Sequence, residues 1–205
     1  IPDSERAFYS KRTIDIEYNF PFGTKELYGL AYRTDFDLTR HQKFSGEDLS
    51  YLDAETGEKF IPHVIEPSLG LQRSVLATLL SAYEEVKGGR TTTTESAKEE
   101  EMVLRLPYAL APVKVAILPL SKKEPLAAMA KEIANELRPL WNVQYDDAAS
   151  IGRRYRRQDE IGTPYCVTVD FESVDDKKVT VRDRDTMAQE RVAITELKNY
   201  LKEKI

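Results

Sequence analysis

The sequence predicts an α/β (α+β) protein in two parts: an antiparallel sheet that carries a helix, then a compact α/β domain with a mixed sheet. Residues 13–33 alternate apolar and polar side chains around a turn, as a β-hairpin does. Residues 110–205 alternate short apolar strands with helical spacings. Between them, residues 87–101 hold a Gly pair, a Thr run and several acids, which indicates a linker or an exposed loop. The predicted domains are 1–86, a linker at 87–109, and 110–205.

The first part is expected to hold three strands and one helix. Apolar residues alternate with polar ones from residue 14 to 20, and residues 26–33 return as an antiparallel strand after a tight turn. Residues 39–58 are polar and irregular, and a third strand covers 60–65, where a proline indicates an edge or a strand start. Beyond a turn at 67–70, apolar spacing predicts a helix of about 14 residues.

The second part is expected to alternate strands with helices, which favours a mixed sheet. The predicted strands are 113–118, 142–145, 165–171 and 179–181. One predicted helix begins at Leu126, after a proline that the first helical turn tolerates. The others are a basic helix at 150–158 and a terminal helix that begins near Ile194.

Composition excludes several classes of function. The 30 Lys and Arg residues against 35 Asp and Glu give a net charge of −5, which excludes a globally basic nucleic-acid binder but not a local basic patch. One cysteine, Cys166, cannot form an internal disulfide, so we expect a reducing, cytoplasmic compartment. A structural zinc site is not expected, because His41, His63 and Cys166 are the only histidine and cysteine residues in the sequence. No apolar run approaches the roughly 20 residues that span a bilayer, so no membrane association is expected.

The most informative pattern lies in residues 64–73. An apolar strand is followed by Glu66, a turn with proline and glycine, and Arg73 in the first turn of a helix. A cation there faces the positive end of the helix dipole, at a cost of about 0.3–1 kcal/mol, where free N–H groups favour an anion. Arg73 therefore indicates a phosphate site, or else it pairs with a nearby acid. Glu66 is either a ligand for an ammonium group or a surface carboxylate at a strand end.

The pattern Glu-Pro-Ser-x-Gly-x-x-Arg at 66–73 resembles motif 3 of the class II aminoacyl-tRNA synthetases, in the form typical of homodimeric glycyl-tRNA synthetases. Three further segments resemble the same family: residues 25–38 (KELYGLAYRTDFDL), 152–164 (GRRYRRQDEIGTP) and 179–186 (VTVRDRDT). The resemblance implies the C-terminal portion of such an enzyme. Its parts would be a piece of the antiparallel catalytic sheet, a linker and an α/β anticodon-binding domain.

The resemblance implies a glycine–tRNA ligase, which forms glycyl-adenylate from glycine and ATP and transfers glycine to tRNA(Gly) in protein biosynthesis. The positions that match glycine-binding residues are Glu66, on the ammonium group, with Ser68 and Gly70. The positions that match ATP-binding residues are Glu26, Leu27, Gly70, Leu71, Gln72 and Arg73, although bacterial members often carry an acid where Gln72 stands. Glu26 also matches a position that can hold Mg²⁺ between phosphates. No nucleophilic residue is needed, because the protein contributes positioning and charge stabilisation.

One geometric question concerns Glu26 and Arg33. In an unbroken strand these two residues face opposite sides of the sheet, so both can line one pocket only if a bulge interrupts the strand. Otherwise Glu26 faces water, as alternate residues of such a strand do.

The residues predicted to bind tRNA are Arg153, Arg154, Arg156, Arg157, Arg182 and Arg184. Four of them crowd the predicted helix at 150–158, where like charges repel unless a polyanion binds, and Tyr155 could stack on a base. The alternative is a solvated face that neighbouring acids neutralise. Arg182 and Arg184 alternate with aspartates and could pair with them instead.

Motifs 1 and 2 of the family supply the dimer interface and the arginine at the α-phosphate, and neither is found in the 205 residues. The chain, which starts at Ile1 without a methionine, is therefore expected to be a piece that is inactive alone, and a homodimer is expected of the full-length protein. One alternative is a non-catalytic tRNA- or DNA-binding accessory protein on a synthetase scaffold. Another is a synthetase for threonine, proline or histidine, which share this type of anticodon domain.

Overall fold

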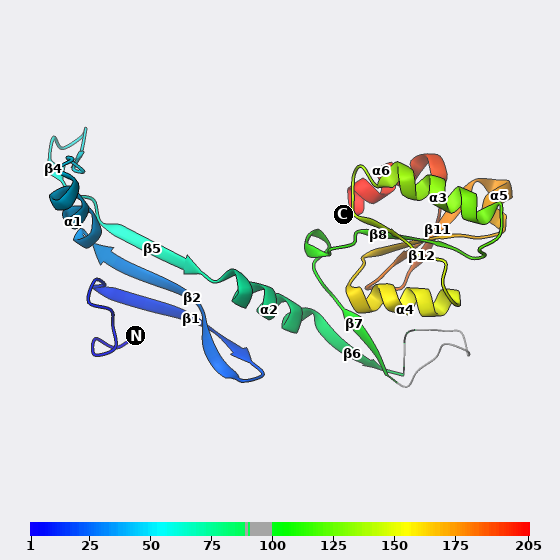
Figure 1. Ribbon diagram of the computed structural model, residues 1–205, viewed down its shortest axis with the longest axis horizontal. Coiled ribbons are helices and arrows are strands. Elements are labelled where there is room, and N and C mark those ends of the chain that lie inside the picture. Colours follow the sequence, from blue (N-terminus) through cyan, green and yellow to red (C-terminus); the bar gives the residue numbers. More distant parts are fainter. Residues whose placement is uncertain (89, 91–99) are drawn as a thin grey trace. The chain divides into compact units, whose positions relative to one another are not determined.

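The computed structural model describes residues 1–88, 90 and 100–205. Within them the chain forms two compact units, Ile1–Leu80 and Ser81–Ile205 (Figure 1). The predicted α/β (α+β) class is confirmed, because the first unit has antiparallel strands and the second a mixed sheet. The Thr run of the predicted linker lies outside the described residues.

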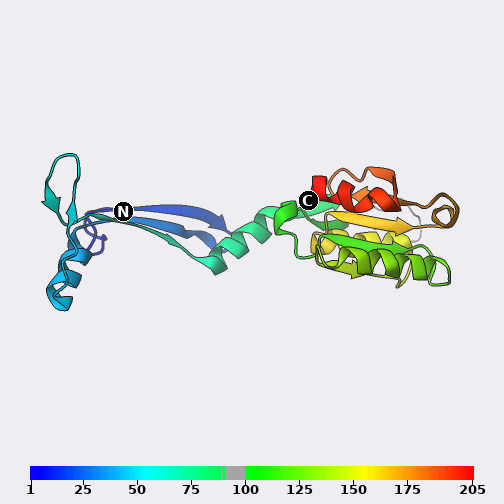
Figure 2. The ribbon, with the colours of Figure 1, turned by 90° about the horizontal axis from the view of Figure 1, so that it is seen from above.

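The first unit is built on a three-stranded antiparallel sheet in the order β1-β2-β5 (Figures 1 and 2). Its elements are β1 (Arg12–Phe20), β2 (Gly23–Thr34), α1 (Phe36–Ser45), β3 (Tyr51–Leu52), β4 (Lys59–Phe60), β5 (Val64–Leu69) and α2 (Leu71–Ala82). The predicted hairpin is present as β1 and β2, and its turn places Gly23 at a φ of 106°, which favours glycine.

Two predictions for this unit are wrong in detail. The third strand begins at Val64 and not at residue 60, and it continues through Pro67 to Leu69, so Ser68 lies within a strand and not in the predicted turn. The proline is tolerated because β5 is an edge strand, whose outer side needs no N–H donor. Residues 39–58, predicted to be irregular, include most of α1, which lacks a readable apolar stripe because none of its residues is buried.

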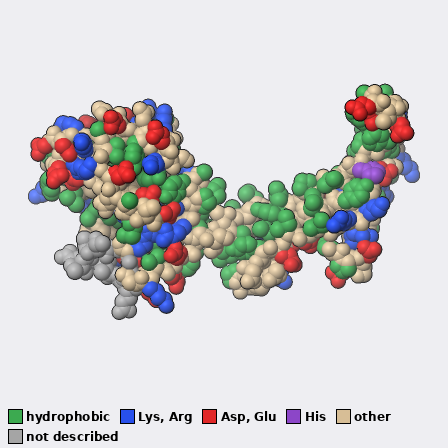
Figure 3. Space-filling model, turned by 180° about the vertical axis from the view of Figure 1, so that it is seen from behind, with side chains coloured by type: hydrophobic (Ala, Val, Ile, Leu, Met, Phe, Trp, Pro, Cys, Tyr) green, Lys and Arg blue, Asp and Glu red, His purple; other side chains and the backbone are tan. Residues whose placement is uncertain are grey.

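The first unit exposes much apolar surface. On its sheet Ile14, Ile16 and Ile65 are 43%, 53% and 66% exposed, and on α2 Leu71 is 73% exposed. Hydrophobic side chains accordingly gather along this unit, at the right of Figure 3. Surface of this kind is unusual for an isolated soluble domain and favours association.

The second unit is a five-stranded mixed sheet in the order β12-β11-β10-β8-β9. Its elements are β6 (Tyr83–Lys87), β7 (Glu100–Leu104), a short 3-10 helix η1 (Tyr108–Leu110), β8 (Val115–Pro119), α3 (Leu126–Leu137), β9 (Val143–Tyr145), α4 (Ile151–Ile161), β10 (Tyr165–Val169), α5 (Glu172–Asp176), β11 (Lys178–Asp183), β12 (Gln189–Ala193) and α6 (Ile194–Lys204). Strand β8 runs parallel to β9 and β10, while β11 is antiparallel to β10 and β12. Each strand and helix predicted for this part is present.

The sheet of the second unit separates two layers of helices (Figure 1). Helices α3 and α6 cover one face through a core that includes Leu137 and Leu201, while Tyr155 of α4 packs against Cys166 on the other face. Cys166 is buried, and burial raises the pKa of its thiol to about 12. The basic helix α4 is therefore separated from α3 and α6 by the sheet.

The hairpin β6–β7 packs on α4, so the second unit begins well before residue 110. Val103 and Leu106, within the predicted linker, are buried in it. Gly162 ends α4 at a φ of 81°, and a Cβ at this position would lie 2.9 Å from the carbonyl oxygen of Leu104. Backbone conformation and space both require glycine there, because the helix end approaches β7 so closely.

Candidate functional site

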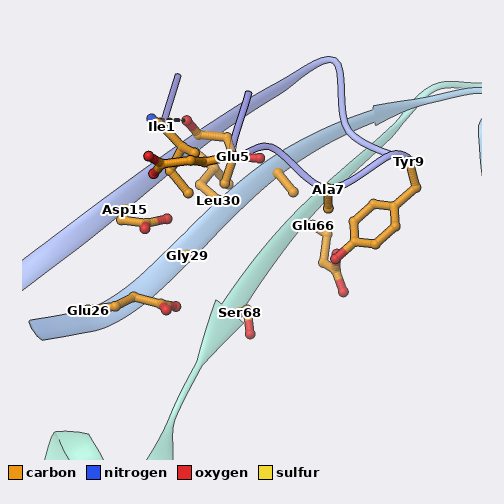
Figure 4. Close-up of a pocket in the computed structure, with 12 residues that line it drawn as sticks. Ile1, Glu5, Ala7, Tyr9, Asp15, Glu26, Gly29, Leu30, Glu66 and Ser68 are labelled. Atoms are coloured by element: carbon orange, nitrogen blue, oxygen red, sulfur yellow. Dashed lines mark hydrogen bonds between the residues drawn. The ribbon is translucent and has the colours of Figure 1, made fainter. Parts of the chain in front are cut away.

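A pocket of about 300 Å³ opens on one face of the three-stranded sheet (Figure 4). Four carboxylates line it, those of Glu5, Asp15, Glu26 and Glu66, and none of its 12 described lining residues is a lysine or an arginine. Figure 4 shows Asp15 coming from β1, Glu26 from β2, and Glu66 with Ser68 from β5. Carboxylates without a basic side chain among them create a negative potential, which favours a cationic group.

A β-bulge places Glu26 on the pocket face. The pairing of β1 with β2 shifts in register between Ile16 and Glu17, and Leu27 on β2 is the extra residue. The insertion brings Glu26 to the side of Gly29, whereas unbroken alternation would put these two on opposite sides. A Cβ on Gly29 would accordingly lie 3.3 Å from Glu26 Oε1. The bulge that the sequence left undecided is therefore present.

A second irregularity in β2 brings Arg33 to Glu66. Arg33 is the unpaired residue where the register with β5 shifts between Tyr32 and Thr34. Its Nη1 donates to Glu66 Oε2 at 2.6 Å, and its Nε and Nη2 donate to the two oxygens of Asp37 at 2.5 and 2.8 Å. Hydrogen bonds from Arg33 hold the pKa of Asp37 below its ordinary value, and those to Asp37 and Glu66 raise the pKa of Arg33.

Arg73 lies in the first turn of α2 and contacts Glu26. Its Nη1 donates to the backbone carbonyl of Glu26 and lies 3.8 Å from Glu26 Oε2. This is the pairing with an acid that the sequence offered as an alternative to a phosphate site. Both side chains are about half exposed, at 52% and 49%, and an ion pair this exposed contributes little to stability. The pair therefore leaves Arg73 accessible to a stronger anion.

The other residues predicted for ATP lie next to this pair. Leu27 is the bulge residue, and Gly70, Leu71 and Gln72 directly precede Arg73 at the start of α2. In the part of the chain that the structure describes, no group of three or more His, Cys, Asp or Glu side chains could hold a metal ion. Glu26 alone would thus bind Mg²⁺ only together with other oxygen ligands, such as phosphates.

Three of the six arginines predicted for tRNA, namely Arg154, Arg182 and Arg184, are buried. Arg154 and Arg184 donate hydrogen bonds to backbone carbonyls around them. Arg182 donates from both Nη atoms to the two oxygens of Asp159 at 2.9 Å. Since their guanidinium groups are enclosed and already bonded, these three arginines stabilise the fold and are no longer candidates for direct tRNA contact.

The other three arginines all lie on α4 and are more accessible. Arg153 is exposed, and neither a hydrogen bond nor an ion pair ties it to another described residue. Arg157 pairs with Asp146 at 2.5 Å and keeps 40% of its side chain exposed. Arg156 pairs with Glu101 and Glu160, each at 3.8 Å. Arg153 and Arg157 are one helical turn apart and so lie on the same side of α4.

Sequence reasoning missed several residues that these sites use. Tyr9, Asp15 and Gly29 line the pocket, but they stand in segments where only a polar or small position of an alternating strand could be read. In the sequence Asp159 is one of several acids that neighbour the basic cluster, whereas in the structure it is the buried partner of Arg182. Its position on the less polar side of the basic helix would have indicated that Asp159 is buried.

Residues 114–204, which make up most of the second unit, match the protein-family model described as an anticodon binding domain. One solved structure, the RNA binding domain of threonyl-tRNA synthetase from Cryptosporidium parvum Iowa II, matches 97% of this chain and 44% of its own with a TM-score of 0.66. The two sequences are 23% identical, so this likeness shows the fold alone.

Over its whole length the chain is similar to glycine–tRNA ligases. It is 53% identical over 207 residues to the ligase of Corynebacterium efficiens and 52% identical over 207 residues to that of Thermobifida fusca. It covers 44% of the length of each, and thus spans less than half of these relatives. The predicted resemblance to glycyl-tRNA synthetases is thereby confirmed. No helix in the described residues is long and apolar enough to cross a membrane.

Proposed function

We propose that this chain is part of an enzyme that activates glycine with ATP and transfers the glycyl group to tRNA(Gly). The observation that carries the proposal is the acid-lined pocket, where Glu26, Glu66 and Ser68 come from two strands to one face of the sheet. Such a pocket suits a small molecule that carries an ammonium group. The anticodon binding domain supports the second half of the proposal, the binding of a tRNA.

In this proposal Glu66 receives the ammonium group of glycine, with Ser68 beside it and Gly70 just beyond the end of β5. A carboxylate and an ammonium form charge-assisted hydrogen bonds, which are stronger than neutral ones. Gly29 lines the same pocket, and a Cβ there would come within 3.3 Å of Glu26 Oε1 and 4.0 Å of the Ser68 Cβ. The absence of a side chain at position 29 therefore keeps the space between these two residues open.

ATP is proposed to lie along the start of α2, against Leu27 and the residues Gly70, Leu71, Gln72 and Arg73. Free N–H groups at the helix start and the guanidinium of Arg73 both favour phosphate there. Glu26 fits Mg²⁺ as a single exposed carboxylate, since Mg²⁺ on nucleotides commonly uses one or two carboxylates together with phosphates. When bound, Mg²⁺ offsets phosphate charge, and the protein orients the glycine carboxylate towards the α-phosphate without supplying a nucleophile.

The tRNA is proposed to contact the second unit along α4, through Arg153 and Arg157 with Arg156 between them. Arg153 and Arg157 are the most accessible arginines of the basic cluster, and phosphate contacts of this kind hold a nucleic acid in register. A homodimer of the full-length protein and a cytoplasmic location stay predictions.

Glu66→Ala is expected to raise the KM for glycine about 10- to 150-fold, because losing a charge-assisted hydrogen bond costs about 1.5–3 kcal/mol. The KM for ATP should change little. The measurement is ATP–pyrophosphate exchange by the complete ligase, meaning one of the relatives above with its matching segment replaced by this chain. Glu17→Ala removes an exposed carboxylate from β1 outside the pocket lining and serves as the control. An unchanged KM for glycine would contradict the role of Glu66.

Arg153→Ala combined with Arg157→Ala is expected to weaken tRNA binding by the chain itself. Each lost phosphate contact should also reduce the slope of log Kd against log salt by about 0.7–0.9. Binding is measured by filter retention or fluorescence at several salt concentrations. The control pair Lys131→Ala and Lys202→Ala removes the same charge from α3 and α6, across the sheet from α4. If both pairs weaken binding equally, or neither does at low salt, tRNA does not bind along α4.

A further inference from the structure

We infer that Arg33 is a positioning residue for glycine, which orients the carboxylate of Glu66 towards the ammonium group of the substrate. The inference rests on the proposed function, because it deepens the role given to Glu66. Arg33 is not among the residues that line the pocket, and it would act only through Glu66.

All three nitrogen positions of the Arg33 guanidinium are engaged. Nη1 donates to Glu66 Oε2 at 2.6 Å, while Nε and Nη2 donate to Asp37 at 2.5 and 2.8 Å. The guanidinium carbon also lies 3.9 Å from the ring centroid of Tyr9, close enough for a cation–π contact. A planar group held in this way at two edges and one face has a fixed orientation, which a lysine could not reproduce.

The exposed fractions of the three side chains indicate that Arg33 holds Glu66 in place. The side chain of Glu66 is 47% exposed, whereas those of Arg33 and Asp37 are 18% and 21% exposed. The well-enclosed arginine therefore holds the more open glutamate, and a half-exposed carboxylate without such a partner would sample several rotamers. The register shift between Tyr32 and Thr34 is what makes the contact possible, because a bulge re-aims the side chain of the extra residue.

Two consequences for binding follow from this contact. Arg33 occupies Oε2 of Glu66, so one oxygen is anchored and the other can accept from an ammonium group. Arg33 also places one cation behind a pocket that carries four carboxylates and no lysine or arginine in its described lining. That charge reduces the repulsion that the carboxylate of glycine would meet on entering.

The test is the KM for glycine and the KM for ATP of Arg33→Gln in pyrophosphate exchange by the complete ligase. We expect the KM for glycine to rise about tenfold or more while that for ATP stays within about twofold. Arg33→Lys keeps the charge but cannot bridge both carboxylates, and should restore only part of the loss. Arg40→Gln is the matched control, because this substitution removes the same charge. Arg40 lies on α1, where its guanidinium stacks on Phe36. A purely structural role would instead lower kcat and raise both KM values together.

A double variant separates this inference from the proposed function. Arg33→Gln together with Glu66→Ala should raise the KM for glycine no further than Glu66→Ala alone, because Arg33 acts through Glu66. If Glu66→Ala raises that KM but Arg33→Gln does not, or if the two effects multiply, the inference is wrong and the proposed function stands. If Glu66→Ala has no effect, the proposed glycine site itself is wrong. Should Arg33→Gln fail to fold, Asp37→Asn must raise the KM for glycine severalfold, and no rise would overturn the inference.

Discussion

Asp159→Ala is expected to destabilise the second unit by about 3–5 kcal/mol, the cost of removing one partner of a buried ion pair. The side chain of Asp159 is 4% exposed and accepts two hydrogen bonds of 2.9 Å from Arg182. It also lies 3.5 Å from Nε of Arg90, a second buried arginine. Without this carboxylate, two guanidinium groups would stay buried with no countercharge between them.

The two arginines differ in how well Asp159 compensates their burial. Burial works against the charge of Arg182, but the hydrogen bonds and charge of Asp159 outweigh it and raise the pKa of Arg182. Burial instead lowers the pKa of Arg90, whose Nε and Nη1 make no hydrogen bond within the described chain. The cluster therefore depends on one carboxylate, and Asp159→Asn should also destabilise, since the amide keeps the shape but loses the charge.

Unfolding of this unit can be followed by itself through Trp141, the only tryptophan, which packs against its core. Urea denaturation of the full chain with Trp141 fluorescence gives the change in free energy of unfolding. Asp176→Ala is the control, because it removes a carboxylate from the more exposed pair with Arg191 and should have a much smaller effect. Equal losses in the two variants would show that the buried pair contributes no more than a surface one.

The chain by itself is expected to bind tRNA. Its rate of glycyl-adenylate formation is expected to be more than about 100-fold below that of the complete ligase. The physical reason is the charge of the pocket, whose described lining offers carboxylates and no basic side chain to an incoming triphosphate. Arg33 is already engaged with Glu66 and Asp37, and Arg73, which stays accessible at the start of α2, is not among the residues that line the pocket. Removing a single preorganised donor to developing charge costs about 10²–10³ in rate, and the described pocket lining holds no lysine or arginine to donate to the α-phosphate.

Pyrophosphate exchange with the purified 205-residue chain tests this expectation against the complete ligase at equal concentration. Glu66→Ala in the same chain is the control for contaminating host enzyme, because activity that survives the substitution does not come from this pocket. Exchange within tenfold of the complete ligase that disappears in Glu66→Ala would show that the chain activates glycine alone.

Much of the fold was predictable because it follows from short-range periodicity. The strands and helices of the second unit bury their apolar residues, so β8, α3, β10 and α6 carry patterns that can be read directly. Helix α1 could not be predicted, since it buries none of its residues and thus has no apolar stripe. The strand end at Leu69 was missed because proline reads as a break, and only the edge position of β5 makes Pro67 acceptable.

The candidate site was only partly predictable. The motif at 66–73 named Glu66, Ser68 and Arg73, and the structure places the first two in one pocket with Glu26 and puts Arg73 beside that glutamate. The sequence predicted tRNA contact for six arginines and left pairing with nearby acids open, because a linear count of charge cannot tell an exposed guanidinium from a buried one. Arg154, Arg182 and Arg184 face into the domain and find carbonyl or carboxylate partners there.

The sequence by itself determined the resemblance to glycyl-tRNA synthetases, the order of the predicted strands and helices in the second unit, and the residues proposed to bind glycine, ATP and tRNA. Only the tertiary structure decided which of those residues share a face. A strand alternates its side chains with a period of two, so one inserted residue at Leu27 and another at Arg33 reverse the side on which their neighbours lie. Pairing with the adjacent strand determines where such an insertion lies. The register of that pairing cannot be predicted from the residues of one strand alone.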